Sequence, residues 1–421
     1  MPCAAQRSVR PYWISAVHIL IIHQAFAALG EPGGTRHHEL ARWLARQGHR
    51  VTILAGQVSY LTGEAGGETP AEWTDDAGVH IRRCATYHAW HRSFFHRVLS
   101  FLSFMFSSFA AGLQTRNVDV VWGTTPPLFQ GGTAWLLARL KRAAFVFEVR
   151  DLWPAFAVAV GVLHSRPLIA LAEAFERFLY RHADRLVVNS PGYVEHVLQR
   201  GARQVDLIPN GVDMSMFNPA ATGAAFRKAH GLRGKFIALY AGALGLSNDL
   251  GVVLNAAALL EHEPEIALVL LGDGKERQTL VARARALCLP NLFFLPAVPK
   301  EEVDQALAAA DACIAILKPL DVYKTTYPNQ VFDYMAAGRP VILAIDGVIR
   351  QLIEEAGAGL FVPPGDPAAL AAAIRRLAAS RAACRAMGRS GRACVARRFD
   401  RASLARGLEQ VMLRAAEDRG R

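Results

Sequence analysis

The residues with the clearest capacity for chemistry stand in the segment Tyr327–Ile342. Pro328 suits the first turn of a helix, and Gly338 and Pro340 mark where that helix ends and a strand begins. Asp333, one turn into the helix, can bind the hydroxyls of a ribose while the helix N-terminus faces a phosphate. The alternative is a surface carboxylate that only stabilises the helix through its dipole.

Two glycine turns precede predicted helices and can offer backbone amides to an anion. They are Gly33-Gly34 and Gly272-Asp-Gly274. Each can also be no more than a tight connection between a strand and a helix. Neither matches GxGxxG, and no acidic residue ends the predicted strand Val51–Ala55, which counts against a nicotinamide or flavin cofactor. We therefore expect no cofactor.

A charged pair, Arg150-Asp151, follows the apolar run Phe145–Val149. If that run is a parallel strand, the pair stands at its carboxyl end, where α/β sheets bind their ligands. Arg150 can hold a phosphate or a carboxylate bidentately, but it cannot act as a base because its pKa exceeds about 12. The alternative is a pairing of Arg150 with Asp151 that only shapes the loop.

Alternating strands and helices must position these residues. Apolar runs typical of buried parallel strands are Ile19–Ile22, Val51–Ala55, Asp119–Trp122, Phe145–Val149, Arg185–Asn189, Phe236–Ala241, Ile266–Leu271, Asn291–Leu295, Ala312–Ile316 and Pro340–Ala344. Helical spacing between them predicts two doubly wound α/β parallel sheets in succession. Two facing sheets form a cleft, and loops after the strands, such as Pro296–Lys300 and Lys318–Gln330, are expected to line it.

Length and composition agree with this organisation. The chain has 421 residues, 52% hydrophobic and 20% charged, which excludes a disordered chain and a single small binding module. The formal net charge of +11 favours phosphate-bearing partners. The charge is dispersed and no nucleic-acid module is recognised, so we expect no nucleic-acid partner. The six cysteines show no CxxC or Cys/His metal pattern, which predicts no metal site and free thiols in a reducing compartment.

The N-terminal run Tyr12–Gly30 resembles a signal peptide, because Arg7 and Arg10 precede it. Polar residues interrupt it, and a glycine loop, a helix and a strand follow, so we interpret it as a buried strand. The predicted domains are a loose extension over residues 1–15, a first domain over 16–212, a second over 213–395 and a helical tail over 396–421. Turn residues clustered between Pro209 and Gly234 place the central boundary.

An aromatic segment, Phe94–Phe109, carries six rings within sixteen residues. It is short and serine-rich for a bilayer span, which takes about 20 apolar residues. Three interpretations stay open: a helix packed on the sheet, a helix in a membrane interface with Arg92 and Arg97 at its edge, and a true span. The side chains expected to insert in the interfacial case are Phe101, Phe104 and Phe106.

The motifs, in this order, resemble those of the family 4 glycosyltransferases, which have two facing Rossmann-like domains in the GT-B arrangement. The matching stretches are Gly33–Thr52, Glu148–Pro154, Ile208–Asp213, Leu271–Gly274 and Phe332–Ile342. Within the family the chain is most similar to bacterial enzymes of O-antigen and capsule assembly that resemble fucosamine transferases, chiefly through Arg150–Pro154.

The resemblance implies retaining transfer of a sugar, of hexosyl or N-acetylhexosaminyl type, from a nucleotide diphosphate sugar that is most often UDP-linked. It implies no metal, so helix N-termini and cations must stabilise the leaving diphosphate. The donor-binding residues that it implies are Gly34, Gly242, Gly272, Lys324, Tyr327, Asn329, Gln330 and Asp333.

The chain departs from the family pattern at three places. The first of the usual two carboxylates falls at Thr325 and is absent, so we expect loop amides of Tyr327–Gln330 to replace its contact with the donor sugar. Gly242–Asp249 lacks the usual Arg and Lys. Arg150, Lys318 and Lys324 are the available substitutes, and Lys324 is preferred because it stands three residues before Tyr327. Relatives often have His-Asp where this chain has Arg150-Asp151. Both residues are our catalytic candidates, and a base role falls to Asp151 or to the leaving phosphate.

The resemblance also implies a lipid-linked sugar acceptor, and hence a cytoplasmic enzyme that is peripheral on the inner face of the cell membrane. The partners expected are the nucleotide-sugar donor, this acceptor and the membrane surface. Two alternatives are a GT-B nucleotide-sugar epimerase, for which no clear carboxylate pair is evident, and a non-catalytic nucleotide-sugar-binding subunit that supports a partner enzyme.

Overall fold

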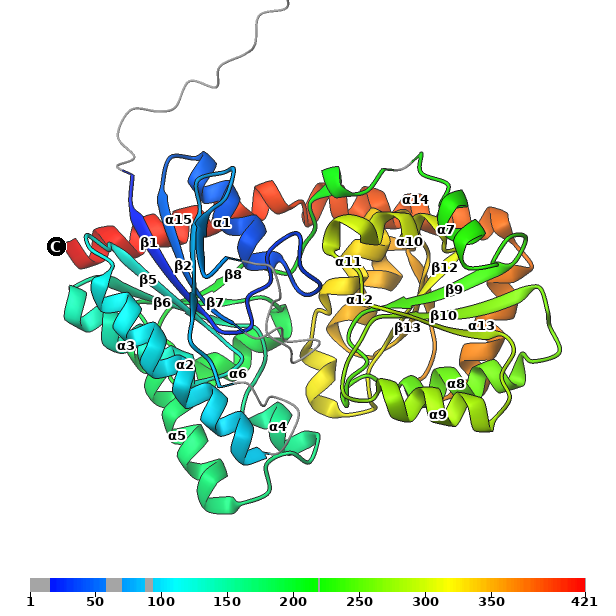
Figure 1. The fold of residues 1–421 in the computed structure, drawn as a ribbon, viewed down its shortest axis with the longest axis horizontal. Coiled ribbons are helices and arrows are strands. Elements are labelled where there is room, and N and C mark those ends of the chain that lie inside the picture. The colour runs from blue at the N-terminus through cyan, green and yellow to red at the C-terminus, as the bar shows by residue number, and fades with distance from the viewer. Residues whose placement is uncertain (1–15, 58–69, 88–93, 219, 421) are drawn as a thin grey trace, which may run out of the picture.

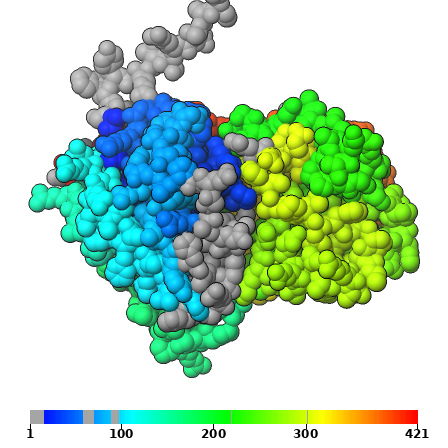
Figure 2. Space-filling view, in the orientation of Figure 1, coloured from blue at the N-terminus to red at the C-terminus, as the bar shows by residue number. Residues whose placement is uncertain are grey.

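The computed structural model describes residues 16–57, 70–87, 94–218 and 220–420, which form two α/β lobes side by side (Figure 1). The predicted extension over residues 1–15 lies outside the described residues. In the space-filling view, the blue-to-cyan lobe of the first half meets the green-to-yellow lobe of the second (Figure 2).

The first lobe is built on a sheet with the strand order β3-β4-β2-β1-β5-β6-β7-β8. Its neighbouring strands are parallel except for β3 and β4. The strands are β1 (His18–His23), β2 (Arg50–Gly56), β3 (Glu72–Thr74), β4 (His80–Cys84), β5 (Val120–Thr124), β6 (Ala144–Val149), β7 (Arg185–Val188) and β8 (Val205–Leu207).

Helices cover both faces of this sheet, because its central strands are apolar on both sides. One face packs against α2 and α3, and the other against α1 and α15. The helices of this lobe are α1 (Arg36–Arg46), α2 (Phe94–Gln114), α3 (Phe129–Lys141), α4 (Ala155–Ala159), α5 (Arg166–His182) and α6 (Val194–Gln199), with a 3₁₀ turn, η1 (Pro191–Tyr193).

The second lobe is built on a fully parallel sheet with the order β11-β10-β9-β12-β13-β14. The strands are β9 (Phe236–Ala241), β10 (Ile266–Leu271), β11 (Leu292–Leu295), β12 (Ala312–Ile316), β13 (Val341–Ala344) and β14 (Gly359–Phe361). The helices are α7 (Ala224–Ala229), α8 (Leu250–Leu259), α9 (Arg277–Ala286), α10 (Val303–Ala309), α11 (Asn329–Ala336), α12 (Val348–Ala356), α13 (Pro367–Ala378) and α14 (Arg381–Arg398), with 3₁₀ turns η2 (Met214–Met216), η3 (Lys300–Glu302) and η4 (Asp321–Thr325).

The last helix, α15 (Arg401–Gly420), crosses back to the first lobe (Figure 1). Its Leu408 and Met412 belong to the same buried cluster as Ile53 and Val146 of the first sheet. The chain therefore passes between the lobes twice. The predicted division at residues 212 and 395 stays a prediction, and the structure adds that the predicted tail carries part of the first lobe's core.

The predicted fold class, two doubly wound parallel sheets, is confirmed. The cysteines that the structure describes are free, as expected. The prediction for the aromatic segment needs a correction. It forms α2, but Phe104 is fully buried in the core of the first lobe and cannot enter a membrane. Among the described helices none is long and apolar enough to cross a bilayer.

Candidate functional site

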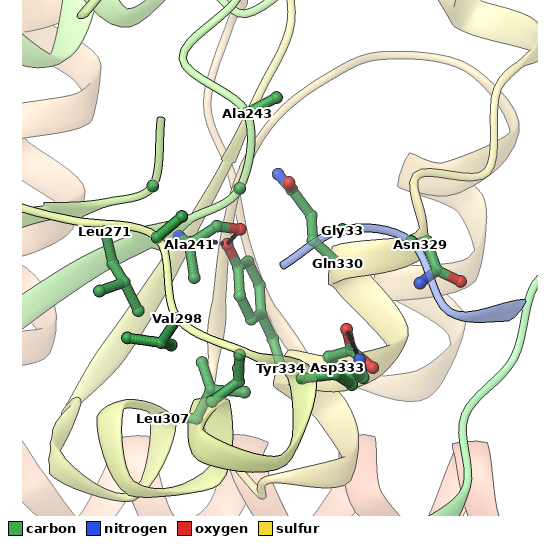
Figure 3. A pocket seen from close by; sticks show the side chains of 16 residues that line it. Gly33, Ala241, Ala243, Leu271, Val298, Leu307, Asn329, Gln330, Asp333 and Tyr334 are labelled. Carbon is green, nitrogen blue, oxygen red and sulfur yellow. Dashed lines mark hydrogen bonds and ion pairs between the residues drawn. The ribbon is translucent and has the colours of Figure 1, made fainter. Parts of the chain in front are cut away.

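A cavity of about 250 Å³ opens where the carboxyl ends of the second sheet's strands face the first lobe. Its walls come from the loop after β1, the ends of β9 and β10, the loop after β11 and the first turns of α11. Figure 3 shows Asn329, Gln330 and Asp333 together on α11, opposite Ala241 and Leu271. The cavity therefore lies at the place where open α/β sheets bind ligands.

Bare backbone forms one side of this cavity. Gly34, Gly242 and Gly272, all predicted from the sequence, are among its lining residues. A Cβ on Gly272 would lie 1.9 Å from the carbonyl oxygen of Gly242, and the Gly272 φ of +152° is one that other residues rarely adopt. Only glycine lets β9 and β10 end so close together, and the same absence of side chains lets a ligand approach the main chain.

Asp333 and Lys300 are the charged residues among the described ones that line the cavity. The ammonium of Lys300 is bonded to Oδ2 of Asp333, and 8% of the Lys300 side chain and 13% of the Asp333 side chain are exposed. Burial raises the pKa of the Asp333 carboxyl, and Lys300 opposes that rise. Lys300 was missed by the sequence analysis, although it ends the loop Pro296–Lys300 that was expected to line the cleft.

A second buried ion pair, near the cavity, joins α1 of the first lobe to the last helix, α15. Nε of Arg401 donates to Oε2 of Glu39 over 2.7 Å, and the Thr35 hydroxyl donates to Oε1 over 2.6 Å. Burial alone would raise the pKa of Glu39, but Arg401 and Lys300 lower it to about 2. No sequence signal predicts the pair, because 362 residues separate its members.

Two helix N-termini add partial positive charge to the cavity. One of these helices, α11, begins at Asn329, whose buried side-chain oxygen has no hydrogen-bond partner among the described residues. The side chain of Gln330 extends from α11 into the open space of the cavity (Figure 3). The second helix, α1, begins two residues after Gly34. An anion in the cavity would thus meet one full cation, Lys300, and two sets of unbonded amides.

Two residues predicted for the donor site are not brought to this cavity. Lys324 is half exposed, pairs with Asp321 over 2.7 Å and lines a separate hollow of about 170 Å³. The ring of Tyr327 packs against Phe332 and Phe399, at centroid distances of 5.7 and 6.2 Å. The geometry offers Lys300, rather than Lys324, as the cation of the cavity.

Thr325, where the resemblance leads one to expect a carboxylate, belongs to a contact between the lobes. Its carbonyl accepts a hydrogen bond of 2.5 Å from the Ser190 hydroxyl, and its own hydroxyl donates to Val322. A Cβ on Gly192 would lie 2.5 Å from Cα of Thr325. Thr325 therefore helps to join the lobes, and the expected contact of the Tyr327–Gln330 amides with a donor sugar stays a prediction.

The predicted pair Arg150-Asp151 stands at the end of β6, beside β1 and β5. Nε of Arg150 donates to the Thr125 carbonyl over 2.6 Å, and its Nη2 lies 3.1 Å from Nε2 of His23. Burial raises the pKa of Asp151 to about 6, against the effects of Arg150 and Thr125. Neither residue lines the cavity that holds Asp333, so the two halves of the predicted site are separate features in this structure.

A buried polar cluster surrounds this arginine. Nε2 of His37 is 2.6 Å from Oε2 of Glu148, and Nε of Arg36 donates to Oε1 of the same carboxylate. Burial alone would raise the Glu148 pKa, yet His37 and Arg36 hold it well below its usual range. The rings of His23 and His37 lie 4.2 Å apart, and burial lowers the pKa of both. A neutral His23 can accept a hydrogen bond from Arg150 and so fix its direction.

The three phenylalanines predicted to meet a membrane have different environments. Phe104 is core, as stated above. Phe101 is partly buried, with its ring 5.8 Å from that of Phe129. Phe106 is 74% exposed. Leu102, Phe106 and Leu113 lie on one face of α2 at helical spacing, and all three are exposed. The exposed apolar face of α2 therefore carries Leu102, Phe106 and Leu113, and Phe106 is the predicted residue that it includes.

Two family models match the chain, and together they account for most of it. The model of a glycosyl transferase 4-like domain matches residues 33–211, and the model of glycosyl transferases group 1 matches residues 224–393. The cavity described above contains residues from both matched segments.

Individual proteins are similar to this chain in sequence or in structure. The chain is 28% identical over 355 residues to WcaI of Escherichia coli K12, a putative colanic acid biosynthesis glycosyl transferase, covering 80% of this chain and 86% of WcaI. Sucrose-phosphate synthase from Thermosynechococcus elongatus has a similar structure, with a TM-score of 0.76, 21% identity and coverage of 96% and 100%. Anabaena HepE, solved with UDP, has a TM-score of 0.68, 16% identity and coverage of 94% and 99%.

Proposed function

This chain belongs to the family 4 glycosyltransferases of the GT-B fold, and on that premise we propose that its cavity binds a nucleotide diphosphate sugar whose sugar it transfers with retention of configuration. The observation that carries the proposal is the pairing of Asp333 with Lys300 in a cavity lined by glycine backbone and two helix N-termini. A carboxylate for a ribose and a cation for a diphosphate are the two groups that such a donor needs.

In the proposed reaction the bond between the anomeric carbon and the diphosphate oxygen breaks, and a bond from the acceptor oxygen to the same carbon forms. Negative charge gathers on the leaving diphosphate. Lys300 and the amides at the N-termini of α1 and α11 stabilise it, because they are held in place before the charge develops. The acceptor's proton passes to the leaving phosphate, since Asp151, the other candidate, does not line the cavity.

We propose a UDP-linked donor and a lipid-linked glycan acceptor. HepE, a structural neighbour, is described in complex with UDP and with UDP-glucose, and WcaI is described as acting in colanic acid biosynthesis. These descriptions support the choice of UDP and of a glycan product. The exposed apolar face of α2 supports a lipid-linked acceptor, since it gives the first lobe a surface for a membrane.

A panel of nucleotide sugars tests the proposal by thermal shift, followed by donor hydrolysis with the purified protein. A donor at about 100 times its dissociation constant should raise the free energy of unfolding by about 2.7 kcal/mol. Slow release of free sugar distinguishes an enzyme from a non-catalytic binding subunit. Interconversion of two nucleotide sugars without release would instead identify an epimerase.

A further inference from the structure

A second hollow, away from the donor cavity, lies at the opposite edge of the first sheet. Its volume is about 420 Å³. It opens at the amino ends of β2 and β4, whereas the glycine loop of the donor cavity follows the carboxyl end of β1. Its lining residues are Arg50, Thr52, Leu54, Glu72, His80, Arg82, Gln114, Thr115, Arg116 and Asn117.

The hollow exists because α2 ends before it has covered the sheet. Side chains of Arg50, Thr52 and Leu54 share one face of β2, since they alternate with the core residues Val51 and Ile53. Leu54 packs into the core beneath α2. Beyond the helix end at Gln114, the same face is polar and the hollow remains open.

Three arginines converge on this hollow from different elements. Arg50 begins β2, Arg82 lies on β4 and Arg116 follows α2. Arg82 donates to Gln114 over 2.8 Å and lies 3.8 Å from Glu72. Within the part of the chain that the structure describes, no carboxylate pairs with Arg50 or Arg116.

Buried and partly buried contacts hold the wall of the hollow in place. Nδ1 of His18 lies 3.1 Å from the Arg116 carbonyl and 3.0 Å from that of Asn117, and its Nε2 lies 2.9 Å from the Thr52 hydroxyl. The carbonyls fix the proton on Nδ1, so Thr52 donates to Nε2. Lys141 also donates to the Thr115 carbonyl over 2.6 Å. The turn that carries Arg116 is thereby anchored to both β1 and α3.

We propose that this hollow, the arginine hollow, is a binding site for a phosphoryl group, separate from the donor cavity. Arginine guanidinium groups match the geometry of phosphate oxygens, and three of them against the single carboxylate Glu72 leave a net positive charge of two. A volume of about 420 Å³ leaves room for a phosphate carried on a larger molecule. That molecule is either a free phosphate ester or the headgroup of an anionic lipid.

Protection of arginines from phenylglyoxal, read by mass spectrometry of the full chain, tests the proposal at the level of single residues. Inorganic phosphate should slow modification of Arg50 and Arg116 at least tenfold, while the exposed Arg376 and Arg389 of the second lobe are unaffected. Vesicles of phosphatidylglycerol, compared with vesicles of phosphatidylcholine, provide the second arm. Protection by free phosphate indicates a soluble ester, and protection by the anionic vesicles alone indicates a lipid headgroup.

Calorimetry with a charge-matched pair of variants completes the test. R50Q/R116Q should weaken phosphate or vesicle binding at least tenfold, whereas R376Q/R389Q, which removes the same charge elsewhere, should change it less than twofold. The proposal would be overturned if phosphate and vesicles slowed modification of all four arginines equally or of none of them. Equal loss of binding in both variants would also overturn it.

Discussion

Lys300 and Asp333, 33 residues apart in sequence, form an ion pair inside the cavity between the lobes. Lys300 reaches the pair from the turn η3 and Asp333 from α11. When a donor is bound, its diphosphate competes for the Lys300 ammonium and its ribose competes for the Asp333 carboxylate. The pair therefore couples the ribose and diphosphate contacts of the proposed donor.

Asp333→Ala should weaken binding of UDP by about 1.5–3 kcal/mol, the scale of a hydrogen bond to a charged group. Isothermal titration calorimetry measures this, with circular dichroism as the check on folding. Asp333→Asn, which keeps the size of the side chain, is the matched control for packing. An unchanged affinity in the folded Ala variant would contradict the ribose assignment.

Activity should survive EDTA, because Lys300 and the helix N-termini supply the positive field that the leaving diphosphate needs. Transfer or donor hydrolysis is measured before and after chelation, and again after Mg²⁺ or Mn²⁺ is added back. Loss with EDTA and recovery with either metal would show that the prediction is wrong.

Asp151→Asn should stabilise the protein at pH 7 and have little effect at pH 4. The folded-state pKa of about 6 lies above the ordinary 3.8, so between these values the folded state holds a proton that the unfolded state has lost. The free energy of unfolding therefore falls as pH rises through this window, by about 3 kcal/mol at 1.36 kcal/mol per pKa unit.

Urea unfolding at the two pH values measures this difference. If Asp151 also accepts the acceptor's proton, the limb of the pH–rate profile near pH 6 should disappear in the same variant. A stability difference that is independent of pH would contradict the assigned pKa.

Leu102→Ser with Phe106→Ser should release the protein from anionic liposomes without unfolding it, because both side chains are exposed on α2. Phe104→Ser is the contrasting variant. Since Phe104 is fully buried, its loss should cost about 3–5 kcal/mol of stability, the range for truncating a core phenylalanine. Co-sedimentation of the double variant at the wild-type level would contradict the membrane role of α2.

The sequence predicts the sheets well because buried parallel strands are continuous apolar runs; the predicted bounds of β9, β10 and β12 match the observed ones. Four strands lack such a pattern and were missed: β3, β8 and β14 have only three residues each, and β4 is largely polar. Phe104 was misjudged because α2 is rich in apolar residues around most of its surface, so periodicity does not show which side faces the core.

The site was predicted in part. Glycines and the start of α11 are local features of turns and helix ends, and they lie at the cavity. Lys300 was overlooked because its role depends on the ion pair with Asp333, which only the tertiary structure creates. Lys324 was preferred for its nearness in sequence to Tyr327, but η4 directs it to solvent and to Asp321 instead.

The affinity of Lys300→Met for UDP tests the central claim most directly, since Lys300 is the cation of the cavity among the described residues. Lys324→Met is the matched control, because it removes the same charge from outside the cavity. We predict that Lys300→Met weakens UDP binding by about 1.5–3 kcal/mol in calorimetry, while Lys324→Met leaves it unchanged. Equal affinity of wild type and Lys300→Met, or a loss confined to Lys324→Met, would contradict the account.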